Sequence, residues 1–326
     1  MPQAIRFHET GGPEVLRLEN VEVADPGPGQ ARVRHSFIAV NFIDIYFRTG
    51  RYPLALPDGL GSDAVGVVEA VGPGVTEVKA GDRVGYLTGP QGAYSQVRVM
   101  PAAVLIPLPE GLPDHTAATL MMKGMTAQYL FRQVRPLQAG ETILYHAAAG
   151  GVGLIACQWA RALGVTMIGT VGTDEKAALA RAAGCAHVIV TARENTVERV
   201  REITGGRGVP VVYDSVGKDT LMDSLDCLQP RGTLVSNGTS SGSVVIDSQL
   251  LAAKGSLWMT RPAMAHYIQP RAHMLEMARE LFDHVLAGRI VSEPQRSFAL
   301  ADAAQAHRAL ESRPVSYTHL TLPTKA

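Results

Sequence analysis

A glycine-rich segment that follows a run of apolar residues constrains the fold of this chain more than any other feature. Residues Ile143–Gly153 read ILYHAAAGGVG, and an amphipathic stretch, LIACQWARAL, follows at once. Ala148, Gly150 and Gly153 reproduce the spacing G-x-G-x-x-G with alanine in the first position. Small residues there let the backbone turn tightly and approach a pyrophosphate, while the first N–H groups of the next helix face the anion. The segment therefore predicts a strand, a dinucleotide-binding loop and a helix rather than a merely structural turn.

Apolar and amphipathic runs alternate around this segment. The apolar runs TMIGTV, HVIVT and VPVVYDSV are separated by KAALARAA and VERVREI, which have helical spacing. Continuous Val/Ile/Leu strands between helices are typical of a parallel sheet that is covered on both faces. We therefore expect an α/β domain with a doubly wound parallel sheet over residues 125–262.

The first third of the chain has a different pattern. Short extended runs are separated by Gly/Pro turns such as PGPG at 26–29, which is typical of a small β-barrel or sandwich. The chain has 326 residues, about twice the ~150 expected per domain, so two domains are expected. A helix over 272–287 and a polar stretch follow the α/β part. We expect a β-rich domain over 1–124 that is completed by residues 263–313.

Charge and cysteine content exclude several classes of protein. Thirty Lys+Arg balance thirty Asp+Glu, whereas proteins that bind nucleic acids or anionic membranes usually carry a basic excess. No apolar run approaches the ~20 residues that span a bilayer, and MPQAIRFHETGG lacks the pattern of a secretory signal. Three scattered cysteines cannot form a disulfide framework. We expect a cytoplasmic protein with no membrane insertion and no specific nucleic-acid partner.

The choice between NAD and NADP is made at the end of the second α/β strand. An NAD site usually carries a carboxylate there for the ribose 2′-hydroxyl. The strand tip, Val171–Thr173, has none, and Lys176 can donate to a 2′-phosphate. The alternative is that Lys176 is a solvated residue of the first helical turn, beside Asp174 and Glu175. We favour NADPH.

The sequence offers no ligand set for a metal ion. Cys157, Cys185 and Cys227 lack C-x-x-C spacing, and the ten histidines are spread singly without an H-x-x-x-H pair. His146, just before the glycine loop, is interpreted as a strand-end residue rather than a base. We predict a protein without a metal site.

Tyrosines cluster near one polar segment of the β-rich part. Tyr46 and Tyr52 flank a loop near Asn41 and Asp44, and Tyr129 lies on the helix that joins the two domains. The alternatives are ordinary loop packing, or a wall that stacks a flat substrate and donates a hydrogen bond to its carbonyl group. The sequence context of Asp44 gives no reason to expect a shifted pKa.

The motifs together resemble one known family. The chain is similar to the quinone oxidoreductase (zeta-crystallin-like) branch of the medium-chain dehydrogenase/reductase superfamily over 1–313. The resemblance rests on FHETGGPEVL, NFIDIYFRTGRYP, GLGSDAVGVVEAVGPGV, AGDRV, GAYSQ, HAAAGGVGLIACQWA, GTVGTDEK, VVYDSVG and TRP at 260–262. It implies a GroES-like catalytic domain, a Rossmann domain, NADPH bound between them, and usually a homodimer formed through the nucleotide domains.

The resemblance also implies which residues bind and react. Zinc-dependent relatives have Cys in place of Asn41 and G-H-E in place of Gly61-Ser62-Asp63, so the substitutions independently favour a metal-free site. The catalytic candidates are Asn41, Tyr46 and Tyr52. The NADPH-binding candidates are Phe42, Ile43, Asp44, Tyr46, Lys123, Thr126, Tyr129, Gly150, Gly151, Val152, Gly172, Thr173, Lys176, Thr191, Val216, Asn237, Gly238, Thr239, Ser240, Arg261, Pro262 and Arg313.

Three positions depart from the family pattern. Thr191 stands where relatives often have a Tyr that stacks near adenine, and Asn237 stands where they often have Phe. After Arg313 the family ends in a Gly-containing aliphatic strand, whereas this chain reads PVSYTHLTLPTKA. Residues 314–326 are interpreted as a non-native or aberrant tail without a recognisable element. If the tail is native, we expect the last barrel strand to be missing and Arg313 to be poorly held.

These features predict an NADPH-dependent quinone reductase that transfers hydride without a metal in the cleft between its domains. A rival with the same chemistry is NADPH-dependent reduction of the C=C bond of an enone or alkenal. A rival of a different class is a non-catalytic NADPH-binding structural or regulatory protein. The sequence does not distinguish which quinone is used.

Overall fold

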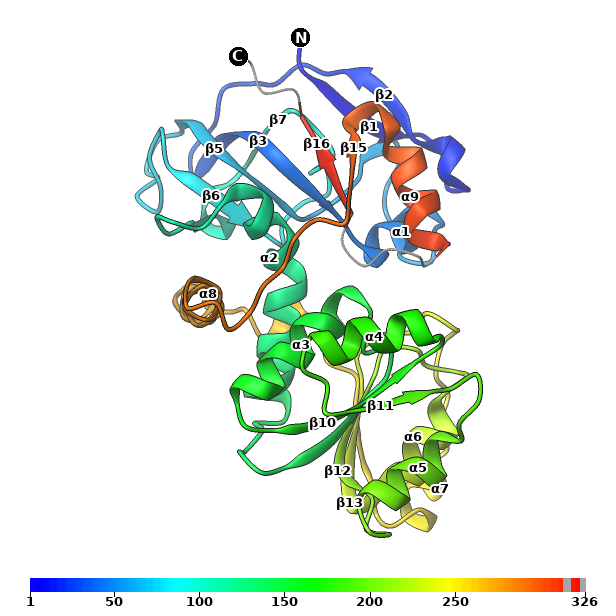
Figure 1. Cartoon of the computed structure of the whole chain (residues 1–326). Helices are drawn as coiled ribbons and strands as arrows, with labels where there is room; N and C mark the ends of the chain where they lie inside the picture. Colours follow the sequence, from blue (N-terminus) through cyan, green and yellow to red (C-terminus); the bar gives the residue numbers. More distant parts are fainter. Residues whose placement is uncertain (313–317, 323–326) are drawn as a thin grey trace. The chain divides into compact units, whose positions relative to one another are not determined.

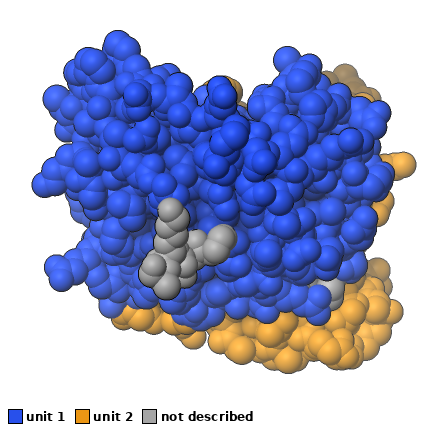
Figure 2. All heavy atoms as spheres, turned by 90° about the horizontal axis from the view of Figure 1, so that it is seen from above, with its two compact units in different colours: residues 1–125, 270–286, 292–326 blue, residues 126–269, 287–291 orange. Residues whose placement is uncertain are grey.

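The computed structural model describes residues 1–312 and 318–322, which divide into two compact units (Figure 2). Unit 1 comprises residues 1–125, 270–286 and 292–326, and unit 2 comprises 126–269 and 287–291. The first boundary lies one residue from the expected position. The return differs, because 263–269 and 287–291 belong to unit 2 and not to the first domain. In unit 2 Tyr267 stacks on Tyr129, and Gln158 exchanges hydrogen bonds with Val291.

Unit 1 is built on a mixed sheet with the strand order β15-β16-β3-β5-β6-β8, and β7 also pairs with β3 (Figure 1). In the central strand β3 (Gln30–Val40), Ala31 and Val33 are buried, while Arg32 and Arg34 alternate with them on the other face. The other strands of this sheet are β5 (Ala64–Val71), β6 (Arg83–Tyr86), β7 (Val97–Pro101), β8 (Ile106–Pro107), β15 (Arg296–Ala299) and β16 (Thr318–Thr321).

A second, three-stranded sheet and the helices complete unit 1. This sheet consists of β1 (Gln3–Phe7), β2 (Arg17–Asn20) and β4 (Asp58–Gly59). The helices are α1 (Phe42–Arg48), α2 (Asp114–Tyr129), which runs on into unit 2, α8 (Arg271–Leu286) and α9 (Ala303–Glu311), with short 3-10 turns at η1 (Pro13–Val15), η2 (Ala102–Val104) and η5 (Leu300–Asp302). Side chains from both sheets and from α9 share one core, which includes Phe7, Ile38, Val84 and Leu310.

The strand β16 lies in the tail for which the sequence suggested no element. Leu320 pairs with Ile38 of β3 and with Phe298 of β15, and its side chain is fully buried. The expectation that a native tail would leave this strand missing is therefore wrong. Backbone pairing depends little on which side chains a strand carries, so THLT fills this place in the sheet. The non-native origin of residues 314–326 stays a prediction.

Unit 2 is a six-stranded parallel sheet with the order β11-β10-β9-β12-β13-β14. Figure 1 shows α3 and α4 on one side of this sheet and α5, α6 and α7 on the other, as expected for a doubly wound fold. The strands are β9 (Thr142–Tyr145), β10 (Thr166–Val171), β11 (His187–Val190), β12 (Val209–Asp214), β13 (Leu228–Ser236) and β14 (Trp258–Thr260). The helices are α3 (Gly151–Ala162), α4 (Asp174–Ala182), α5 (Thr196–Ile203), α6 (Leu221–Cys227) and α7 (Ser248–Ala253), with a π-helical segment η3 (Leu130–Val134) and a 3-10 turn η4 (Met264–His266).

None of the helices among the described residues is both long and apolar enough to cross a membrane.

Candidate functional site

The loop between β9 and α3 is shaped by close backbone contacts. A Cβ atom on Gly153 would lie 2.5 Å from the carbonyl oxygen of Ala147 and 2.6 Å from that of Ala148. Ala148 is itself confined, because a Cβ on Gly169 of β10 would lie 2.5 Å from its methyl group. Gly150, the N-cap of α3, has no side chain to cap the first turn. The loop thus fits the pyrophosphate of a dinucleotide, since its backbone is accessible and the helix N-terminus favours an anion.

Beyond β10, the helix α4 carries Lys176 and one half of the ion pair between Asp174 and Arg193. Thr173 caps α4, and its Oγ1 accepts a hydrogen bond of 3.3 Å from the backbone N–H of Lys176. Arg193 donates to both carboxylate oxygens of Asp174, at 2.7 and 2.8 Å. Within the described part of the chain, no partner is recorded for the Lys176 ammonium group, which is partly exposed. The negative charge of Asp174 is therefore balanced by Arg193, and Lys176 is available to a phosphate.

The loop after β12 is organised by one buried carboxylate. Asp214 Oδ1 accepts hydrogen bonds from the backbone N–H groups of Val216 (2.8 Å) and Gly217 (3.0 Å). Its Oδ2 accepts hydrogen bonds from the hydroxyl groups of Thr220 (2.7 Å) and Ser224 (2.8 Å). Both oxygens are thus satisfied, and the turn that carries Val216 is fixed by side-chain contacts as well as by its backbone.

The same network reaches the residue before the glycine loop. His146 Nε2 lies 3.0 Å from Ser224 Oγ, and His146 Nδ1 lies 3.0 Å from Thr170 Oγ1 of β10. Burial lowers the pKa of His146, against the negative charge of Asp214. A neutral, doubly hydrogen-bonded ring agrees with the interpretation of His146 as a strand-end residue. It links β9, β10 and α6 where the cofactor loop begins.

The remaining candidates of unit 2 lie in two further places. The backbone N–H of Ser240 donates to the Ser215 carbonyl oxygen at 3.3 Å, so the loop 237–240 packs on the loop after β12. Arg261 Nη1 donates to the backbone of β13 at 3.0 Å. Tyr129 stacks on Tyr267, with ring centroids 5.0 Å apart, and burial raises the pKa of Tyr129 to about 12.

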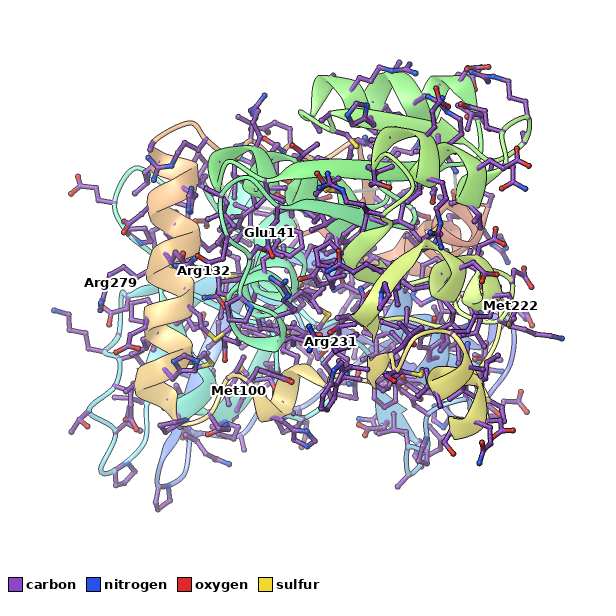
Figure 3. The ribbon with its side chains drawn as sticks, turned by 90° about the horizontal axis from the view of Figure 1, so that it is seen from below. Met100, Arg132, Glu141, Met222, Arg231 and Arg279 are labelled. Carbon is purple, nitrogen blue, oxygen red and sulfur yellow. The ribbon has the colours of Figure 1, made fainter. Side chains whose placement is uncertain are left out.

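Most predicted cofactor contacts in unit 2 therefore share one edge of its sheet. They follow the carboxyl ends of adjacent strands: Gly150–Val152 after β9, Gly172–Lys176 after β10, Thr191 after β11, Val216 after β12 and Asn237–Ser240 after β13. In parallel sheets, ligands bind outside this edge. At the amino-terminal edge, Glu141 (labelled in Figure 3) instead forms a salt bridge with Arg135 at 2.7 Å.

Asn41 is the centre of a buried polar cluster in unit 1. It is the N-cap of α1, and its backbone N–H donates to Asp44 Oδ2 at 2.8 Å. Its side-chain Oδ1 accepts a hydrogen bond from Lys123 Nζ at 2.8 Å, and its Nδ2 donates to Asp63 Oδ2 at 3.1 Å. The side-chain amide of Asn41 thus joins a cation and one carboxyl group, and its backbone N–H binds a second carboxyl group.

A row of hydrogen-bonded side chains extends from Asp44 to α9. Tyr94 donates its hydroxyl proton to Asp44 Oδ2 at 2.9 Å, and the Tyr94 oxygen lies 3.1 Å from His307 Nε2. Arg48 Nη1 lies 3.1 Å from His307 Nδ1, and Arg48 Nη2 pairs with Glu311 at 2.5 Å. All of these contacts lie within unit 1.

Burial dominates the electrostatics of the Asn41 cluster. It raises the pKa of Asp44 to about 7, although the Asn41 N–H and the Tyr94 hydroxyl oppose the shift. It raises the pKa of Asp63 to about 6, against the charge of Lys123. It also lowers the pKa of Lys123, against Asp63 and Asp44. The expectation of an unshifted pKa for Asp44 is therefore wrong, because the whole side chain is removed from water.

The candidate tyrosines of unit 1 lie together. The rings of Tyr46 and Tyr52 are 5.3 Å apart, and Phe42 is 6.1 Å from Tyr46. The Arg51 guanidinium lies 4.6 Å from the Tyr46 centroid, and all three aromatic residues are partly exposed. They form an aromatic surface beside α1 that could stack a flat ring and donate hydroxyl groups. Ile43, on the first turn of α1, is also partly exposed.

Three further points concern the predicted sites. Thr126 and Pro262 lie in unit 2, and Arg313 lies outside the described residues. Among the described residues there is no group of three or more His, Cys, Asp or Glu side chains that could hold a metal ion. This holds for residues 1–312 and 318–322, and a reaction without a metal ion stays a prediction.

Comparison with protein families defines the class. Residues 27–110 match the alcohol dehydrogenase GroES-like domain, and residues 151–287 match the zinc-binding dehydrogenase family. The two matches fall mainly on units 1 and 2 respectively, so the chain has the two-part organisation of the medium-chain dehydrogenases.

Comparison with individual proteins defines the family. The chain is 51% identical to a quinone oxidoreductase of Pseudomonas aeruginosa, over 99% of this chain and 100% of that protein. It is 48% identical to a 2-haloacrylate reductase of a Burkholderia species, over 99% of both chains. The crystal structure of Escherichia coli quinone oxidoreductase in complex with NADPH matches with a TM-score of 0.96 and 47% identity, over 98% of this chain and 100% of that one. The chain therefore belongs to the quinone oxidoreductase family of the medium-chain dehydrogenase/reductase superfamily.

Sequence reasoning missed several residues of the site. Tyr94 and His307 lie 50 and 263 positions from Asp44 along the chain, and Arg193 lies 19 positions from Asp174. No local spacing marks such pairs. Asp214 offered a weak signal, since it ends a buried strand at the edge where ligands bind.

Proposed function

We propose that this protein is an NADPH-dependent quinone reductase. The observation that carries the proposal is the fit of the Ala148–Gly153 loop to a dinucleotide, in a chain that is 51% identical over its whole length to a quinone oxidoreductase. NADPH, when bound, supplies a hydride from its nicotinamide ring. The chain has to bind the cofactor, orient it and stabilise the charge that develops on the substrate.

Each unit contributes different residues to this task. In unit 2 the glycine loop holds the pyrophosphate, and Lys176 donates to the 2′-phosphate. In unit 1 Tyr46 and Tyr52 stack the quinone ring and, with Asn41, donate to the carbonyl oxygen on which negative charge develops. Removing one hydroxyl donor from this partly exposed set should cost roughly 1 kcal/mol of transition-state stabilisation. Positioning supplies much of the remaining rate enhancement.

The polarity of the cofactor site supports NADPH over NADH. The tip of β10 has no carboxylate for a ribose 2′-hydroxyl. The Lys176 ammonium is available to a phosphate, and Asp174 is balanced by Arg193. Thr191 offers no ring to stack on adenine, which weakens both cofactors alike and leaves the preference unchanged.

A second candidate function is reduction of a conjugated C=C bond. The observation in its favour is the 48% identity to a 2-haloacrylate reductase. Quinones and enones both present a conjugated carbonyl group, so the same donors would serve either substrate. A steady-state assay of 1,4-quinones beside 2-alkenals and 2-haloacrylate distinguishes the two. We expect higher kcat/KM on quinones; turnover of the alkenes alone would overturn the first choice, and binding of NADPH without any turnover would favour a non-catalytic protein.

We propose that the reaction needs no metal ion. The Asn41 amide and the Lys123 ammonium occupy the cluster that also contains Asp63, and a cation already balances its carboxylates. Dialysis against a strong chelator should leave turnover unchanged. Loss of activity that added zinc restores would contradict this.

We propose a cytoplasmic homodimer formed through unit 2. The strand β14 is the edge of the parallel sheet, and Trp258 on it is 68% exposed. An open strand edge with a large apolar side chain is suited to pairing with a second copy. Light scattering should report a dimer for the wild type and a monomer for Trp258→Glu, whereas Leu286→Glu on α8, also exposed, serves as the control.

A further inference from the structure

The Asn41 cluster contains two carboxyl oxygen atoms that take no part in its hydrogen bonds. In the described part of the chain, Oδ1 of Asp44 and Oδ1 of Asp63 are buried and have no hydrogen-bond partner. The other oxygen of each carboxyl group accepts two hydrogen bonds. Buried polar atoms are rarely left unpaired, and each exception needs an explanation. A cluster that served only to hold α1 would gain from satisfying these atoms or from replacing them by apolar groups.

The direction of the neighbouring hydrogen bonds is fixed by chemistry. A guanidinium group only donates, so Arg48 donates to His307 Nδ1, and the proton of the neutral ring is on Nε2. His307 Nε2 then donates to the Tyr94 oxygen, and Tyr94 donates to Asp44 Oδ2. Burial, with the charge of Arg48, lowers the pKa of His307 to about 3, so the ring stays neutral. Because Arg48 cannot release a proton, this row holds Asp44 in place and does not conduct protons from α9.

Within the Asn41 cluster, Lys123 has more accessible surface than either carboxylic acid. Asp44 and Asp63 are 0% and 1% exposed, whereas Lys123 keeps 7% of its surface accessible. Its Nζ is anchored on the Asn41 amide at 2.8 Å. Asp63 and Asp44 raise the pKa of the Lys123 ammonium, against the burial that lowers it. The two carboxyl groups also favour the return of a proton to Lys123 after it has been lost.

We propose that Lys123 is the catalytic acid of quinone reduction, and that Asn41, Asp44 and Asp63 are the positioning residues that hold it and keep it charged. The inference rests on the proposed function and assigns Lys123 to the reaction in place of the cofactor contact that the family resemblance implies. Reduction of a quinone to a hydroquinone takes up one hydride and one proton. The hydride leaves a hydroquinone mono-anion. The Nζ–H bond of Lys123 then breaks, its electron pair stays on nitrogen, and an O–H bond forms on the product oxygen. The neutral amine takes its proton back from water.

This role makes the rate depend on pH in a defined way. Activity needs protonated Lys123, so kcat/KM on quinones falls as pH rises through the pKa of Lys123, which burial sets below its usual value. The groups that act on this ammonium are Asp63 and Asp44, which raise its pKa. His319 of β16 also lies nearby, and burial lowers its pKa to about 3, so its ring is neutral. His115 of α2 acts on His319. Asp63→Asn removes the larger of the two opposing charges. The alkaline limb of the profile should then move to lower pH.

Two substitutions separate proton donation from charge and from cofactor binding. Lys123→Met keeps the length of the side chain but has no proton to donate, and Lys123→Arg keeps the cation but does not release its proton. We expect both to lower kcat at saturating NADPH by about 100-fold or more, the usual contribution of general acid catalysis. The loss should be greatest for quinones whose hydroquinones have the highest pKa. The NADPH dissociation constant should stay within about twofold of the wild type, and Lys254→Met, a lysine paired with Asp226 in unit 2, should keep full activity.

The outcomes are distinguishable. If the wild type does not reduce quinones with NADPH, the proposed function fails. If it does, and Lys123→Arg keeps more than about a third of its kcat with an unchanged alkaline limb, Lys123 is not the acid. If the NADPH dissociation constant rises while kcat at saturation is unchanged, Lys123 only binds the cofactor. Should Lys123→Met fail to fold, the arginine variant and the pH profiles of wild type and Asp63→Asn still decide the question.

Discussion

The two units treat their buried carboxyl groups in opposite ways. In unit 2, Asp214 accepts hydrogen bonds at both oxygens from two backbone N–H groups and from two hydroxyl groups. In unit 1, Asp44 and Asp63 are equally buried, and each has one oxygen without a partner among the described residues. A saturated carboxylate fixes the shape of a loop, whereas an unsaturated one keeps capacity to exchange protons. Unit 2 therefore uses its buried carboxylate to fix a loop, whereas the buried carboxyl groups of unit 1 keep unpaired oxygen atoms.

The largest effect should come from removing the saturated carboxylate. Asp214→Ala leaves several buried donors without an acceptor, so the free energy of unfolding should fall by about 4 kcal/mol. Urea unfolding measures this, with exposed Asp219→Ala as a control that should change it by less than about 0.5 kcal/mol. If Asp214→Ala lowers the free energy of unfolding by less than about 1 kcal/mol, the hydrogen bonds of Asp214 do not stabilise unit 2 as proposed.

The unsaturated carboxyl groups should instead make stability depend on pH. Burial raises the pKa of Asp63 from 3.8 to about 6, so the folded state binds more protons than the unfolded state between these values. Stability from this group is therefore present at low pH and is lost as pH rises from about 4 to about 6. The loss should be roughly 2–3 kcal/mol, at 1.36 kcal/mol per pKa unit. Asp44, whose pKa burial raises to about 7, adds a loss of stability in the same direction over this range. Asp63→Asn should therefore make the slope between about pH 4 and about 6 shallower by the contribution of Asp63; an equally steep slope in the variant would assign it to other groups.

Cofactor preference should change more modestly, and only through unit 2. A charge-assisted contact of a partly exposed lysine is worth roughly 1.5 kcal/mol, so Lys176→Ala should reduce the NADPH/NADH ratio of kcat/KM about tenfold. Raising the ionic strength should erode the wild-type ratio, because the site is exposed. Arg193→Ala should reduce the ratio less, by exposing the phosphate to the charge of Asp174. A wild type that uses both cofactors equally, or an alanine variant with the full preference, would show that Lys176 has another role.

The smallest change should follow removal of one hydroxyl group from unit 1. Tyr52→Phe keeps the ring next to Tyr46 and removes one donor, so kcat/KM on quinones should fall about fivefold, the worth of roughly 1 kcal/mol. NADPH affinity should stay the same. Unchanged kcat/KM would show that Tyr52 only packs in its loop and does not act on the substrate.

The sequence predicted unit 2 better than unit 1, for a physical reason. The contacts after β9 and β10 come from residues that are close along the chain, and steric rules fix which residues fit a tight loop beside a helix N-terminus. The cluster around Asn41 joins segments that are 22 to 82 residues apart, and the row from Asp44 ends at Glu311. Burial, which sets the pKa values of that cluster, exists only after these segments are packed. The strand β16 was missed because THLT pairs through its backbone and lacks the aliphatic pattern from which a buried strand is predicted.

One comparison of two lysines tests most directly whether unit 2 binds the cofactor and unit 1 supplies the proton. Lys176 lies in unit 2 and Lys123 in unit 1, and both NADPH dissociation constants and kcat at saturating NADPH can be determined for Lys176→Ala and Lys123→Met. The account predicts that Lys176→Ala weakens NADPH binding about tenfold with kcat within about twofold of the wild type. It predicts the reverse for Lys123→Met, with a loss of kcat of about 100-fold and nearly unchanged binding. A Lys123→Met variant that loses affinity for NADPH in proportion to its loss of kcat would contradict the account.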